Sequence, residues 1–183
     1  MNRSVLTKTL IAALVAAAPL AAQDHDAKFR FGGQLSFASP IGDLQDIAST
    51  GVGVSVFGEL PMSMNTAIRG RVDYIIFGTK KINYLFSDVE DVVIALDGIY
   101  SFNEYDNGFY ALVTAGIQRM SWKLSQYAAS DSALCYGAGV GYNFNRRFGI
   151  EAKYIKGPAI AIKERDGFDF SNNYIQVSVS HRF

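Results

Sequence analysis

The chain has 183 residues, of which 17 are basic and 17 acidic, and about half (49%) are apolar. This balance excludes the strongly basic surface of a nucleic-acid-binding protein, and the length fits one domain better than two. The single cysteine, Cys135, excludes an intramolecular disulfide and has no partners for a redox or metal site. We expect it to be a small, half-buried side chain.

The N-terminal segment has the pattern of a secretory signal peptide. Arg3 and Lys8 precede an apolar run from Leu10 to Ala18, and small residues follow up to Gln23. We therefore expect residues 1–23 to be removed on export, residues 24–28 to form a short stub, and residues 29–183 to form the mature domain. No later stretch reaches the roughly 18 apolar residues of a spanning helix, so a membrane crossing would require a closed barrel.

Four segments in the first half of the mature chain alternate apolar and polar side chains, the period of a β-strand. They cover residues 29–39, 51–60, 67–77 and 91–102. In the first, Leu35 and Phe37 share one face while Gln34 and Ser36 share the other. Each segment is predicted to be a strand with one apolar face.

Four more segments follow, at residues 109–123, 133–144, 148–156 and 174–183. The first of these is the least regular, because Leu112 and Thr114 make its second face only mildly polar, and a shift of phase near Trp122 stays open. The last alternates as well, with Val177 and Val179 opposite Gln176, Ser178, Ser180 and Arg182.

The connections and the aromatic residues follow a second pattern. Short connections at residues 61–66, 103–108 and 145–147 alternate with longer ones at about 40–50, 78–90, 124–132 and 157–172. Barrels of the outer membrane have short periplasmic turns, longer outer loops and aromatic girdles at both interfaces. We expect the outer girdle to consist of Phe37, Tyr74, Phe77, Trp122, Tyr136, Tyr154 and Tyr174.

Together with the terminal Phe183, the segment Pro40–Leu44 and the repeated glycines of Gly137–Gly141, this order of strands resembles the small eight-stranded outer-membrane β-barrels of the OmpA and OmpX type. The resemblance covers the whole mature chain; His181 departs from the apolar pattern of the last strand. It implies an all-β fold, an eight-stranded antiparallel up-and-down transmembrane barrel with a polar, side-chain-filled interior, in the outer membrane of a Gram-negative bacterium. It also implies a monomer without a cofactor, with outer-membrane lipid and the barrel-assembly machinery as partners and Phe183 as the assembly signal.

The inward faces carry four cationic and four anionic side chains: Arg30, Glu59, Arg69, Arg71, Asp73, Asp97, Glu151 and Lys153. Pairing about the turn at residues 62–65 sets Glu59 opposite Arg69, and pairing about the turn at residues 145–147 sets Gly141 opposite Glu151. A narrow eight-stranded interior is filled by side chains in this way, and buried charges must be paired. We interpret these residues as a plugged, salt-bridged interior; a gated pore or proton path is the alternative.

No catalytic, cofactor or metal residues are predicted. Enzymatic barrels that resemble this one place a histidine beside a serine or on an outer loop, because a hydroxyl nucleophile needs a base. This chain has His25 in the stub and His181 near the other terminus, and Ser180 points to the opposite face from His181. A final group of carboxylates is interpreted as solvated loop charge, with a weak divalent-cation site as the alternative: Asp88, Glu90, Asp91, Asp166 and Asp169.

The sequence thus predicts a non-enzymatic integral outer-membrane protein whose four surface loops serve a structural, adhesive or partner-binding role. Tyr84, Phe86, Phe168 and Phe170 are candidate contacts for an extracellular ligand, or they fold the loops down. Two alternatives stay open: a soluble periplasmic barrel that binds an apolar ligand, which would invert the two faces, and a small low-conductance channel.

Overall fold

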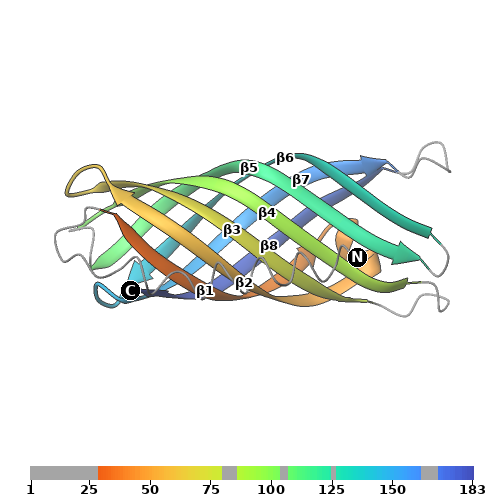
Figure 1. The fold of residues 1–183 in the computed structure, drawn as a ribbon, viewed down its shortest axis with the longest axis horizontal. Coiled ribbons are helices and arrows are strands. Elements are labelled where there is room, and N and C mark those ends of the chain that lie inside the picture. The colour runs from red at the N-terminus through yellow and green to blue at the C-terminus, as the bar shows by residue number, and fades with distance from the viewer. Residues whose placement is uncertain (1–28, 80–85, 104–106, 125–126, 162–168) are drawn as a thin grey trace, which may run out of the picture.

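A computed structural model describes residues 29–79, 86–103, 107–124, 127–161 and 169–183. They form one closed barrel of eight strands, tilted around a common axis (Figure 1). The strands are β1 (Arg30–Ile41), β2 (Ala48–Pro61), β3 (Thr66–Thr79), β4 (Phe86–Ser101), β5 (Gly108–Leu124), β6 (Tyr127–Asn143), β7 (Phe148–Ala161) and β8 (Asp169–Arg182), and the one described helix is α2 (Leu44–Ile47).

Each strand pairs antiparallel with its neighbour in the sequence, and β1 pairs with β8 from Gly32↔Arg182 to Ile41↔Asn173 to close the barrel. The even strand number brings the C-terminal end of β8 to the end that carries the turns after β2, β4 and β6 (Figure 1). We call this the inner end and the opposite one the outer end. The predicted fold class is confirmed.

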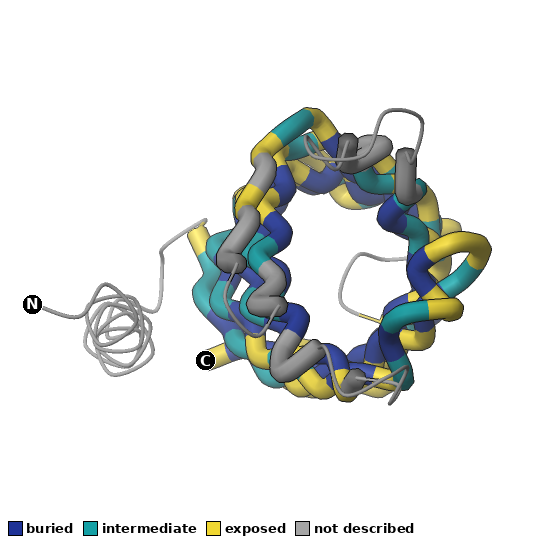
Figure 2. Tube along the Cα trace, turned by 90° about the vertical axis from the view of Figure 1, so that its right-hand side faces the viewer, coloured by how far each residue is buried: buried dark blue, intermediate teal, exposed yellow. Residues whose placement is uncertain are grey.

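The two faces of the wall differ as the alternation predicts, and buried and exposed positions alternate around the barrel (Figure 2). Leu35, Val113 and Leu134 project outward and are 68%, 65% and 77% exposed, whereas Gln34, Arg69 and other polar side chains point inward and are buried. This arrangement rules out the soluble alternative, which requires apolar side chains inside and charges outside.

An apolar belt encircles the barrel. On each strand the outward positions are mostly apolar over about nine to eleven residues, the length that spans a membrane in a tilted strand. Towards the outer end they change to more polar or small residues: Ser39, Thr50, Gly78, Glu90, Arg119, Ser132, Lys156 and Asn173. The belt ends at the inner rim in exposed aromatic side chains: Phe29, Tyr100, Phe102, Phe109, Phe144, Phe148 and Phe183.

The outer girdle is smaller than predicted. Phe37, Tyr136 and Tyr154 are exposed on the outward face, but Phe77 and Tyr174 are 1% and 0% exposed. Both point into the barrel, where their rings pack edge to face with centroids 5.6 Å apart. The prediction was wrong for these two because the strands carry aromatic residues at inward positions as well, and an aromatic ring by itself does not identify the face.

The strands are longer at the outer end than predicted. β4, β6, β7 and β8 include residues 86–90, 127–132, 157–161 and 169–172, which the sequence analysis assigned to long loops. The phase of β5 does not shift near Trp122, because β5 pairs with β6 without interruption from Gly108↔Asn143 to Leu124↔Tyr127. In the described part of the chain, no helix is long and apolar enough to cross a membrane.

Candidate functional site

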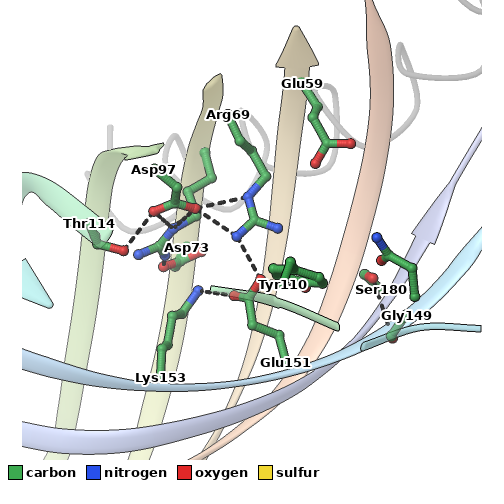
Figure 3. Close-up of polar contacts among 12 residues, drawn as sticks. Glu59, Arg69, Asp73, Asp97, Tyr110, Thr114, Gly149, Glu151, Lys153 and Ser180 are labelled. Atoms are coloured by element: carbon green, nitrogen blue, oxygen red, sulfur yellow. Dashed lines mark hydrogen bonds and ion pairs between the residues drawn. The ribbon is translucent and has the colours of Figure 1, made fainter. Parts of the chain in front are cut away.

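The middle of the barrel interior holds a network of buried ions (Figure 3). Arg69 on β3 donates from Nε to Asp97 Oδ2 on β4 (2.8 Å) and from Nη2 to Glu151 Oε2 on β7 (2.7 Å). In a closed barrel of eight strands, β3 and β7 are opposite walls. The Arg69–Glu151 pair therefore crosses the lumen.

Each carboxylate of this network has further donors. Asp97 also accepts bonds from Arg71 Nε (3.0 and 3.1 Å) and from the Thr114 hydroxyl (2.7 Å). Glu151 also accepts bonds from Lys153 Nζ (3.0 Å) and the Tyr110 hydroxyl (2.9 Å). A further ion pair joins Arg71 to Asp73. Every ion of the network has at least one hydrogen bond or ion pair with an opposite charge, which offsets part of the cost of burying it, while Arg69 Nη1 and Arg71 Nη2 have no hydrogen-bond partner among the described residues.

A second ion pair lies nearer the inner end. Arg182 on β8 donates from Nε to Glu59 Oε1 on β2 (2.9 Å) and from Nη1 to Asn143 Oδ1 on β6 (3.0 Å). Glu59 does lie opposite Arg69 in the register, as predicted, and Gly141 lies opposite Glu151. In the structure, Glu59 bonds to Arg182 and Arg69 bonds to Asp97 and Glu151.

An apolar cluster lies inside the barrel towards the outer end. Leu44 of α2 is 2% exposed and packs in a cluster with Ala38, Phe77 and Tyr174. Gly42 enters the turn before α2 with φ +63°, a conformation that glycine adopts without steric cost.

The turn before α2 is fastened to β8. The Asp43 carboxylate accepts hydrogen bonds from the Ser171 backbone N–H (3.0 Å) and the Ser171 hydroxyl (2.9 Å). These two bonds hold the pKa of the exposed Asp43 carboxyl below its usual value, because they stabilise its charged form. We call the Asp43–Ser171 contact the latch.

The structure places the remaining predicted residues in several environments. Arg30 is half-buried at the inner rim, in register with Glu59. Cys135 is 2% exposed and free, so it is buried rather than half-buried. Phe183 is 51% exposed and its backbone N–H donates to Phe31 O (2.9 Å). Its role as an assembly signal stays a prediction.

The loop residues need the largest correction. Asp91 is a buried, inward-facing residue of β4 that accepts a hydrogen bond from Gln118 Nε2, and not a solvated loop carboxylate. Phe86 and Phe170 lie in β4 and β8 instead of loops. Tyr84, Phe168, Asp166, His25 and the predicted signal peptide and stub lie outside the described residues. Among the described residues, no group of three or more His, Cys, Asp or Glu side chains could hold a metal ion.

Sequence reasoning left four partners out of the network. Arg182 lies on the polar face of the last strand, and the alternation of that strand was sufficient to predict that Arg182 points into the interior. Asn143 and Thr114 also fall on inward positions. Tyr110 is harder to find, because an aromatic residue near the inner rim is expected in the girdle, whereas here it is 2% exposed and bonds to Glu151.

Residues 9–183 match the family model of the outer membrane protein β-barrel domain. The chain belongs to this family. Among solved structures, this outer-membrane barrel is similar to the N-terminal β-barrel domain of Pseudomonas aeruginosa OprF (14% identity, 84% of this chain and 97% of that one, TM-score 0.55). It is also similar to Ail, the attachment invasion locus protein of Yersinia pestis (16%, 85% and 97%, 0.55), and to Neisserial surface protein A (16%, 86% and 98%, 0.55).

A comparison with curated protein sequences gives no match. At 14 to 16% identity, the solved structures share the fold with this outer-membrane barrel, and their functions do not carry over by similarity alone.

Proposed function

We propose that this protein is a non-enzymatic, ion-tight barrel of the outer membrane whose outer end serves a structural, adhesive or partner-binding role. The proposal includes export by the signal peptide, insertion by the barrel-assembly machinery and a monomeric state in outer-membrane lipid. The observation that carries it is the Arg69–Glu151 pair, which joins opposite walls of the lumen (Figure 3).

Two closures in series support the ion-tight interior. The ion network lies across the middle, and the apolar cluster under Leu44 lies between it and the outer end. An ion that passed would have to displace buried, hydrogen-bonded charges and then pass a cluster in which most side chains are apolar, and both steps are costly.

The environment of the described histidine supports the absence of hydrolytic activity. His181 lies between the rings of Phe148 and Phe183, with centroids 4.7 and 5.0 Å away, on the outward face near the inner rim. Ser178 and Ser180 point into the barrel and are 1% exposed. A base on one face of a strand cannot take a proton from a hydroxyl on the other.

Conductance tests the ion-tight barrel. The chain folded into a planar bilayer should give no steady single-channel steps. Replacing only Leu44 with Ser, or only Arg69 and Glu151 with Ser, should leave one closure in place, and combining the three changes should open a conducting path. Steady steps from the unaltered chain would show that it is a small channel.

The role of the outer end is tested separately. That Ail, a barrel of the same fold, is named for attachment and invasion supports adhesion as one such role. Cells that display this chain should bind a host-type surface, and replacing residues 80–85 and 162–168 with glycine-serine turns should abolish the binding. The barrel itself should stay folded, which is measured as a difference in gel mobility between unboiled and boiled samples (the heat-dependent mobility). Equal binding by both cell types would contradict a loop-borne adhesive role.

A further inference from the structure

The strand glycines of this barrel differ in how closely other side chains surround them. Inward-facing glycines make room for large side chains: a Cβ at Gly141 would collide with Tyr110, and one at Gly32 with Phe57. Gly70 faces outward, and a Cβ there would meet nothing nearer than Leu96 Cδ2 at 3.7 Å, an ordinary contact. Packing within the protein therefore does not require a glycine at position 70.

Glycine weakens a strand interior, and a glycine without an internal reason often marks the close approach of a ligand or of another chain. In the register, Gly70 is paired with Gly58 on β2 and Leu96 on β4, and Leu96 is paired with Ala115 on β5. One transverse row of outward positions thus contains Gly58, Gly70, Leu96 and Ala115. A Cβ at Gly58 would collide with the Phe29 ring, so Gly70 is the glycine of this row that lacks a close internal contact.

An apolar groove of about 700 Å³ follows this row across β1 to β5. Its outward-facing side chains include Phe31, Val56, Ile94, Leu96 and Ile117. Ile94 and Leu96 are 60% and 63% exposed, so they stand up from the wall beside Gly70. The groove lies inside the apolar belt and is continuous with the lipid-contact surface.

We propose that this groove binds one acyl chain of an outer-membrane lipid. All of its outward-facing side chains are apolar, which matches a hydrocarbon chain, and the surrounding bilayer supplies such chains at a concentration that favours occupancy. A flexible chain can lie over Gly70 and bend past Leu96, which stands in the same row. A second barrel would bring one convex wall against another, so that only a narrow strip of each would touch.

The test uses two tryptophan reporters in the full chain, with the one natural tryptophan, Trp122, replaced by Phe. Ile94→Trp replaces one of the side chains that line the groove, and Ile150→Trp lies on β7, the opposite wall. The protein is folded into vesicles of a short-chain phosphatidylcholine that contain a small fraction of a long-chain, dibrominated phosphatidylcholine. Bromine quenches tryptophan only at close range, so quenching reports the local occupancy of the long chain.

At low fractions of brominated lipid, we expect quenching at position 94 to exceed that at position 150 by about two- to fivefold, since the gain comes from added contacts and not from transfer out of water. Gly70→Leu, which fills the groove, should bring the two reporters to parity. The matched control Ala152→Leu, on the lipid face of β7, should leave position 94 unchanged. Gly70→Ala, with a smaller side chain, should give an intermediate value.

Equal quenching at both reporters, or no response to Gly70→Leu in a barrel with normal heat-dependent mobility, would overturn the proposal. If the Gly70→Leu variant does not fold, the quenching at position 94 in the Gly70→Ala variant decides whether the proposal holds. Loss of quenching at position 94 as protein density rises, together with energy transfer between labelled copies, would assign the groove to a second barrel instead. The inference rests on the membrane placement of the proposed function; conductance by the unaltered chain would overturn the ion-tight interior and leave this result intact.

Discussion

Replacing Arg69 with methionine tests whether the ion network holds the barrel together. Arg69 is fully buried, donates to both Asp97 and Glu151, and its guanidinium lies 5.5 Å from the centroid of the Phe57 ring. Methionine keeps much of the apolar volume and adapts to irregular space, so the change removes mainly the charge and its hydrogen bonds.

The magnitude follows from what stays behind. Two hydrogen bonds to charged groups contribute about 1.5 to 3 kcal/mol each, and removing one partner of a buried ion pair costs about 3 to 5 kcal/mol. Asp97 keeps Arg71 and Glu151 keeps Lys153, so neither carboxylate loses every cation. We expect Arg69→Met to lower the free energy of unfolding by about 3 kcal/mol, the lower part of that range.

Reversible urea unfolding in lipid vesicles measures this loss. With a slope of about 2 kcal/mol per M, the midpoint should fall by about 1.5 M. Arg119→Met is the matched control, because Arg119 is exposed above the apolar belt and should change the free energy of unfolding by less than about 0.5 kcal/mol. Equal, small effects of the two substitutions would refute the reasoning and indicate that water solvates the interior charges.

Three further predictions concern the ion pair near the inner end, the latch and the apolar cluster under Leu44. Replacing Glu59 or Arg182 with methionine should each cost about 3 kcal/mol, but the double variant should cost less than the sum by about 1 to 3 kcal/mol, as measured by a double-mutant cycle of unfolding free energies; strict additivity would show that the two side chains do not interact. The pKa of Asp43 is lowered in the folded state, so the stability that the latch contributes is fully present above the ordinary aspartate pKa of about 3.9 and is lost as the pH falls through the lower folded value. Hydrogen exchange at the Ser171 amide, corrected for its intrinsic rate, should therefore be slow near neutral pH and accelerate only in this acid range, and Asp43→Ala should make it fast at every pH; protection that survives the substitution would contradict the latch. Leu44→Ala should lower the free energy of unfolding by about 2 to 3 kcal/mol, because the leucine is almost fully buried; a loss below about 0.5 kcal/mol would mean that α2 does not seal the outer end.

The alternation of side chains was sufficient to predict eight strands, their order and most inward residues. It predicted which residues lie opposite each other within a hairpin, as for Glu59 and Arg69. It could not predict the bonds across the lumen. Arg69 and Glu151 are 82 residues apart and meet only because the strands tilt and the barrel closes. The partner of a buried charge thus depends on how the strands are staggered around the barrel, and the side-chain pattern of one strand does not contain this information.

The outer ends of the strands show a second limit, and it has a physical cause. Within the belt one face meets lipid and the other meets polar side chains, so the period of two is strong and β6 was placed from residue 133 onward. Above the belt the outward face no longer meets lipid, and the alternation disappears in the sequence Tyr127–Ser132 although the backbone still pairs with β5 as far as Tyr127. On its other edge, β6 pairs with β7 only from Asn143↔Gly149 to Tyr136↔Lys156. Pairing with β7 therefore ends near the rim of the belt, while pairing with β5 continues beyond it. In lipid every backbone group needs a partner, but in water an unpaired edge is solvated, so the wall must be closed inside the belt and need not be closed above it. The hydrophobic pattern predicts the strand residues that cross the membrane. It does not predict the residues by which backbone hydrogen bonding alone extends a strand beyond the membrane.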